Sequence, residues 1–119
     1  MRRPTTFHLG LLTELAGYAD TDWRWLQRHV ESAAARPCRD AEPATFFPPD
    51  GARFPAQALH AERARVAELC DGCPVRQECL AAALLRGETW GSWGGVAQPD
   101  YQMLQRLWRD QVEASEGAA

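Results

Sequence analysis

The chain has 119 residues and a mass of 13.3 kDa, which is the size of one small domain. Hydrophobic residues make up 45% of it and charged residues 24%, and 13 basic against 16 acidic side chains give a net charge of −3. This composition excludes a wholly disordered chain and a collagen. The apolar runs are far shorter than the ~20 residues that cross a bilayer, so no membrane contact is expected. The chain also lacks the basic excess of an electrostatic nucleic-acid binder.

The N-terminus carries Arg2 and Arg3 ahead of an apolar stretch at 7–12, which resembles a twin-arginine export signal. Polar residues and a glycine interrupt that stretch, and no small-residue cleavage site follows it. We therefore expect a cytoplasmic protein. In that compartment the four cysteines are kept as reduced thiols.

Glycines and prolines divide the chain into helical segments, and no long stretch alternates with the period of a strand. The sequence therefore predicts an all-α fold, a small bundle of about four to five short helices. The expected helices cover residues 8–19, 23–36, 56–70, 75–86 and 99–112, and the residues from 114 onward are expected to fray. The fourth helix has the clearest boundaries, with Cys73 at the N-cap, Pro74 at the first position and Gly87 beyond the end.

Two segments between the helices have a distinctive composition. Residues 37–56 are broken by prolines, yet they carry three phenylalanines, among them Phe46 and Phe47. A loop this apolar is expected to pack against the rest of the domain. Residues 87–95 are rich in glycine and predict a tight, rigid turn that holds the Trp93 side chain in a fixed position.

Cys38, Cys70, Cys73 and Cys79 follow the pattern C-x31-C-x2-C-x5-C. The C-x-x-C step brings two sulfurs to one side of a turn, which suits a metal ion or a cluster. Two disulfides are disfavoured in a reducing cytosol, and a thioredoxin-type redox site would need a βαβ context that this pattern lacks. From the spacing alone, a structural zinc site and an iron–sulfur cluster stay equally open.

The cysteines belong to a set of short motifs in a fixed order: Cys38-Arg39-Asp40, Phe46-Phe47-Pro48, Cys70-Asp71-Gly72-Cys73-Pro74-Val75-Arg76, Cys79-Leu80 and Gly91-Ser92-Trp93-Gly94-Gly95. Together these motifs resemble the WhiB-like family of iron–sulfur transcriptional regulators. The ordered set is far more specific than a lone C-x-x-C. On this basis the chain divides into an N-terminal helical extension (1–36), a WhiB-like iron–sulfur domain with a Gly/Trp β-turn (37–96), and a C-terminal helix with a short acidic tail (97–119).

The resemblance implies a small cytoplasmic regulator with one [4Fe-4S] cluster that responds to oxygen or nitric oxide, and whose apo form can hold disulfides. The residues that match the family's cluster ligands are Cys38, Cys70, Cys73 and Cys79. Many members dock the cluster-bearing face onto region 4 of the primary sigma factor of RNA polymerase. The residues that match this partner surface are Phe46, Phe47, Trp93, Gly91, Gly94 and Gly95. The expected state is a monomer that binds one sigma factor.

The chain departs from the family pattern in places that bear on function. Ser92 stands where the family usually carries valine or isoleucine, so the turn lacks a hydrophobic side chain that would support it. Many members also end in a basic arm that binds DNA, whereas the segment after Gly95 has only Arg106 and Arg109 against four acidic side chains. Such a segment would repel phosphates. Contact with promoter DNA is therefore expected to be indirect or weak.

Two other classes of function stay open. One is a structural zinc adaptor with four cysteine ligands. The other is an apo-form thiol–disulfide reductase acting through Cys70 and Cys73. We do not expect an enzyme, because His8, His29 and His60 are isolated in the sequence and no nucleophile–base pair or phosphate-binding loop is recognisable.

Overall fold

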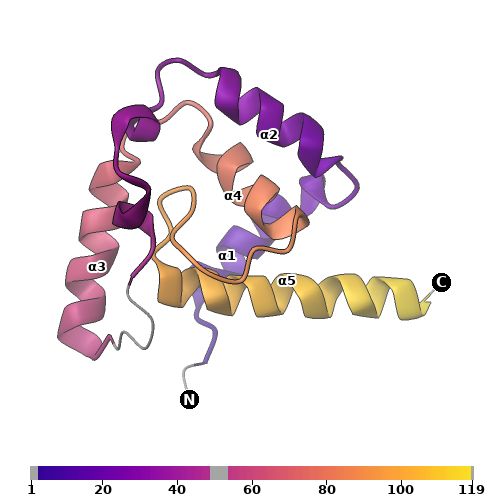
Figure 1. Ribbon diagram of the computed structural model, residues 1–119. Coiled ribbons are helices and arrows are strands. Elements are labelled where there is room, and N and C mark those ends of the chain that lie inside the picture. Colours follow the sequence, from indigo (N-terminus) through magenta and orange to yellow (C-terminus); the bar gives the residue numbers. More distant parts are fainter. Residues whose placement is uncertain (1–2, 49–53, 119) are drawn as a thin grey trace.

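The computed structural model describes residues 3–48 and 54–118 of the chain. In these segments the chain forms five α-helices, shown in Figure 1: α1 (Thr6–Leu15), α2 (Trp23–Ser32), α3 (Ala56–Leu69), α4 (Arg76–Leu85) and α5 (Gln98–Ala118). Short 3-10 turns lie between them: η1 (Ala16–Tyr18), η2 (Pro37–Asp40) and η3 (Pro43–Phe46). The only β pairing within the described segments is an isolated bridge between Trp93 and Val96. The predicted all-α bundle is confirmed.

Helix α4 supplies the centre of the core, because all of its residues from 80 to 84 are buried. Three of these are alanines, whose small side chains allow the neighbouring helix α2 to pack closely through Leu26. Helix α1 packs on α5, which contributes Tyr101, Leu104 and Trp108 to the same cluster. In Figure 1, α5 runs along the base, with α2 and α4 above it and α3 at the side. None of the helices formed by the described residues is long and apolar enough to cross a membrane.

Three helices end several residues away from the predicted position, and the first is α1, which ends at Leu15 and passes into η1 instead of continuing to residue 19. Helix α2 begins where expected, since the Asp22 carboxylate accepts a hydrogen bond from the N–H of Arg24 at 2.9 Å. It ends at Ser32, however, several residues before the proline that was expected to stop it. Helix α5 continues to Ala118, so the prediction of a frayed tail is wrong. Ala114, Glu116 and Ala118 of this segment are strong helix formers, and they extend α5 although they add no apolar face.

Helix α4 begins at Arg76, two residues after Pro74, its predicted first position. Cys73 is therefore not its N-cap, which is Val75, whose C=O accepts a hydrogen bond from the N–H of Cys79 at 2.8 Å. The turn after α3 accounts for the shift, because it uses the N–H of Cys73 to donate to the C=O of Cys70 at 3.2 Å. The helix thus presents Cys79, not Cys73, from its first turn.

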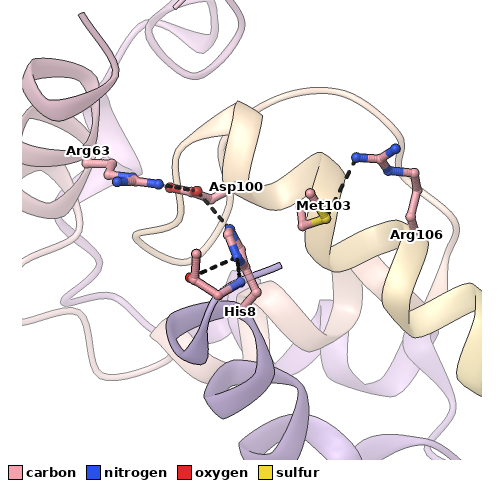
Figure 2. A network of polar contacts seen from close by, with 6 residues as sticks. His8, Arg63, Asp100, Met103 and Arg106 are labelled. Carbon is pink, nitrogen blue, oxygen red and sulfur yellow. Dashed lines mark hydrogen bonds and ion pairs between the residues drawn. The ribbon is translucent and has the colours of Figure 1, made fainter. Parts of the chain in front are cut away.

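A buried polar network joins α1, α3 and α5 (Figure 2). Asp100 of α5 accepts hydrogen bonds from Arg63 of α3 through both carboxylate oxygens, at 2.7 and 2.8 Å, and its Oδ1 lies 2.9 Å from Nε2 of His8 in α1. The N–H of Thr5 donates to Nδ1 of His8 at 3.0 Å, so Nε2 carries the proton and donates to Asp100. Burial acts to raise the pKa of Asp100, but the hydrogen bonds from Arg63 and His8 outweigh it and hold that pKa below its usual value. His8, which is isolated in the sequence, thus has Asp100 as its partner in the fold.

Candidate metal centre

The four cysteines line one cavity of about 350 Å³. Cys38 comes from η2, Cys70 from the residue after α3, Cys73 from the turn that follows and Cys79 from the first turn of α4. All four are free, half-buried thiols. Cys38, in the proline-rich loop, therefore lines the same cavity as the three cysteines at the junction of α3 and α4.

The thiols line the cavity without converging on one point. Within the segments that the structure describes, no three side chains of His, Cys, Asp or Glu lie close enough together to hold a single metal ion. All four cysteines nevertheless line the same cavity. The four thiols therefore share one cavity without forming a ready-made site for a single metal ion.

Burial disfavours the thiolate form of two of these cysteines. It raises the pKa of Cys79 to about 11 and raises the pKa of Cys70 above its usual value. Backbone hydrogen bonds oppose this effect, from Gly94 to Cys79 and from Gly95 to Cys70. A bound metal or cluster would supply the positive charge that holds buried sulfurs as thiolates. This donor set fits a thiophilic group.

The turn between Trp93 and Val96 presses against the start of α4. The N–H groups of these two residues each donate to the other's C=O, at 3.1 and 2.9 Å, around Gly94 and Gly95 with φ of +54° and +81°. A Cβ on Gly94 would overlap the C=O of Arg76, and Nε of that arginine donates to the C=O of Gly94 at 3.1 Å. The predicted tight turn is confirmed, and it needs glycine for both its backbone angles and its close contact.

An aromatic rim, formed by Phe46, Phe47 and Trp93, lines the same cavity. The Phe47 ring meets Trp93 edge-on with centroids 5.7 Å apart, and the C=O of Phe46 accepts a hydrogen bond from the N–H of Ser92 at 2.7 Å. A Cβ on Gly91 would lie 2.7 Å from the Phe47 ring, so the loop and the turn meet only because this residue has no side chain. The structure thus brings the residues expected to bind a partner together beside the cysteines.

Arg86 is a residue of this site that the sequence did not reveal. Its guanidinium lies 4.7 Å from the centre of the Trp93 ring and donates to Oε1 of Gln27 at 2.7 Å. It also lies 3.5 Å from the carboxylate of Glu88 and lines the cysteine cavity, where its charge opposes the rise in the pKa of Cys79. No local motif marks Arg86, because its partners lie on α2 and on the turn. It links the aromatic rim to the thiols.

Comparison with known proteins places these features in a family. A family model described as transcription factor WhiB matches residues 32–104. The chain is 37% identical over 82 residues to the redox-responsive transcriptional regulator WhiB3 of Mycolicibacterium smegmatis, covering 69% of this chain and 76% of that protein. It is 35% identical over 82 residues to the transcriptional regulator WhiD of Streptomyces coelicolor, covering 69% of this chain and 71% of that protein.

A third relative is the transcriptional regulator WhiB1 of Mycobacterium tuberculosis, which is 42% identical over 69 residues, covering 58% of this chain and 77% of that protein. No solved structure matches the chain. The segment matched by the family model contains all four cysteines, the aromatic rim and Arg86. The chain belongs to the WhiB family.

Proposed function

We propose that this chain is a cytoplasmic, redox-responsive transcriptional regulator whose sensor is one [4Fe-4S] cluster. Cys38, Cys70, Cys73 and Cys79 would hold the cluster, which supplies a group that oxygen and nitric oxide can attack. The observation that carries the proposal is that Cys38, more than thirty residues before the other three cysteines, lines the same cavity as they do. Relatives described as redox-responsive transcriptional regulators support it.

The dimensions of the cavity favour a cluster over a single zinc ion. Zinc would draw four sulfurs to about 2.3 Å from one point. In a four-iron cluster each cysteine binds a different iron, so the sulfurs stay farther apart. A volume of about 350 Å³, lined by thiols that do not converge on one point, supports the larger group.

The aromatic rim is the surface that we propose for region 4 of the primary sigma factor. Phe47 is 38% exposed, and rigid aromatic side chains beside a polar edge are efficient anchors for a partner. The rim adjoins Cys38 and Cys79 through the shared cavity. Loss of the cluster would release the loop that carries Cys38, and this would change the shape of the rim.

We propose that one monomer binds one sigma factor and that promoter DNA is reached mainly through that complex. The C-terminal half of α5 exposes Asp110, Glu113 and Glu116 against Arg109. This acidic surface would repel the DNA backbone. The proposed role is that of a regulator and not of an enzyme.

Metal and sulfide analysis of anaerobically purified protein tests the cofactor. We expect about four iron and four sulfide per chain, with a broad visible absorption that bleaches in air or with nitric oxide. A colourless protein with one zinc per chain would contradict the sensor proposal and leave a structural zinc domain.

Trp93→Ala tests the partner surface, with Trp25→Ala as the matched control. Trp25 is 55% exposed on α2 and does not line the cysteine cavity. We expect Trp93→Ala to weaken binding of isolated sigma region 4 by about tenfold or more, while Trp25→Ala leaves it nearly unchanged. Both variants should keep their iron. Equal binding of sigma region 4 by the two variants would show that the aromatic rim is not part of the interface.

A further inference from the structure

A second pocket, of about 400 Å³, lies between the N-terminal end of α1 and the first turns of α5. It shares no lining residue with the cysteine cavity. Its charged lining consists of Arg3, Arg63 and Arg106 against a single carboxylate, Asp100. We call it the arginine pocket.

The carboxylate of Asp100 is already neutralised. Its Oδ2 accepts from Nε of Arg63 at 2.7 Å, and its Oδ1 accepts from Nη2 of Arg63 at 2.8 Å and from Nε2 of His8 at 2.9 Å. A buried carboxylate with this many donors has little capacity left for another cation. It does not serve as the counter-charge for the remaining arginines.

Arg3 and Arg106 have no acidic partner among the described residues, since every ion pair there involves other arginines or His8. Nη2 of Arg106 lies 3.7 Å from Sδ of Met103, and a thioether is only a weak acceptor. Figure 2 shows Asp100, Met103 and Arg106 along α5, at positions three residues apart, which share one side of a helix. The pocket therefore gathers two arginines, Arg3 and Arg106, whose guanidinium groups make no ion pair with any described residue.

We propose that the arginine pocket binds the phosphate group of a small phosphorylated molecule. Guanidinium groups present pairs of N–H donors whose spacing matches phosphate oxygens. Arg3 and Arg106 would supply these donors, with the amide of Gln102 as a further polar group on the lining. A volume of about 400 Å³ is within the range of small-molecule sites.

The surroundings favour a small ligand over the backbone of a nucleic acid. A duplex needs a row of basic groups along its path. Beyond Arg106, α5 exposes one further arginine and then Asp110, Glu113 and Glu116. On this part of α5 the positive charge is thus confined to the arginine pocket, which has room for one phosphate-bearing molecule.

Calorimetric titration of the full chain with glycerol 3-phosphate, and with glycerol at matched ionic strength, tests this proposal. We expect heat of binding and a raised melting temperature with glycerol 3-phosphate only, because a ligand of the folded state stabilises it. Arg106→Gln and Arg3→Gln should each raise the dissociation constant by about tenfold. Arg109→Gln is the matched control, since Arg109 is exposed on the same helix but does not line the pocket.

Three results would overturn the proposal. The first is no binding of glycerol 3-phosphate at millimolar concentration by a protein that melts cooperatively. The second is an equal loss of affinity in Arg109→Gln and Arg106→Gln, which would indicate unspecific attraction of anions. The third is tight binding of a short DNA duplex, measured by fluorescence anisotropy, that Arg106→Gln abolishes and glycerol 3-phosphate does not compete. Iron content plays no part in these readouts, so their outcome is separate from that of the cluster proposal.

Discussion

The hydroxyl of Ser92 accepts a hydrogen bond from the backbone N–H of Gln98 at 2.9 Å, and Oε1 of Gln98 accepts one from the N–H of Gly91 at 2.8 Å. Ser92 and Gln98 are both buried. The first N–H groups of a helix have no partner within the helix, so Ser92 satisfies one of them from the preceding turn. A residue expected only to weaken the turn, by replacing an aliphatic side chain, instead fastens the turn to α5.

Replacing Ser92 by alanine should therefore destabilise the protein. The change leaves the N–H of Gln98 buried without an acceptor, which costs about 1–3 kcal/mol. Urea unfolding followed by circular dichroism measures the loss, and Ser115→Ala, at an exposed position of α5, serves as the control. A stability equal to that of Ser115→Ala would show that the hydrogen bond contributes nothing.

The features that the sequence predicted well depend on residues close together in the chain. The start of α2 at Trp23 and the positive φ angles of Gly94 and Gly95 follow from local stereochemistry. The four cysteines were grouped by their motif, and the structure brings them to one cavity.

The features that the sequence did not predict are contacts between distant residues. His8 and Asp100 are 92 positions apart, and their hydrogen bond depends on how α1 packs on α5. Arg86 likewise finds Gln27 and Trp93 only after three separate segments have assembled. Local propensity carries no information about such pairs, because tertiary packing creates them.

Two glycine-to-alanine changes should have opposite effects on stability. Gly94→Ala places a Cβ at φ +54° against the C=O of Arg76, so it should cost at least about 1–2 kcal/mol and displace the turn from Cys79. Gly10→Ala adds a methyl group in α1 where nothing lies within 4 Å, and it should stabilise the protein by about 0.5–1 kcal/mol. Urea unfolding of both variants distinguishes them. If both changes stabilised the chain, the turn would not have the tight geometry described above.

Arg86→Met should lower stability by about 1–2 kcal/mol, because it removes a cation–π contact with Trp93 and a hydrogen bond to Gln27 while keeping most of the aliphatic stem. A double-mutant cycle with Trp93→Leu isolates the first contact. We expect Arg86→Met to lower the free energy of unfolding by less in the Trp93→Leu variant than in the wild type. Arg109→Met is the control for removal of an exposed arginine. Strict additivity of the two changes would mean that the ring and the guanidinium do not interact.

The network at Asp100 should make part of the stability depend on pH. The folded-state pKa of Asp100 lies below the unfolded value of about 3.9, so the ionised carboxylate stabilises the folded state above that pH. This contribution is lost as pH falls from about 4 through the folded-state pKa.

Asp100→Asn, which cannot ionise, should cost about 1.5–3 kcal/mol at pH 7, since it weakens hydrogen bonds from Arg63 and His8. The difference in unfolding free energy between wild type and variant should narrow as the pH is lowered from 5 to about 2.5. Asp110→Asn, at an exposed position of the same helix, corrects for the general effect of acid. Comparing differences also removes any acid lability of a bound metal group, because that loss is common to all three proteins. A gap that stayed constant with pH would mean that the Asp100 carboxylate is not stabilised by its neighbours, and that α1, α3 and α5 are joined by packing alone.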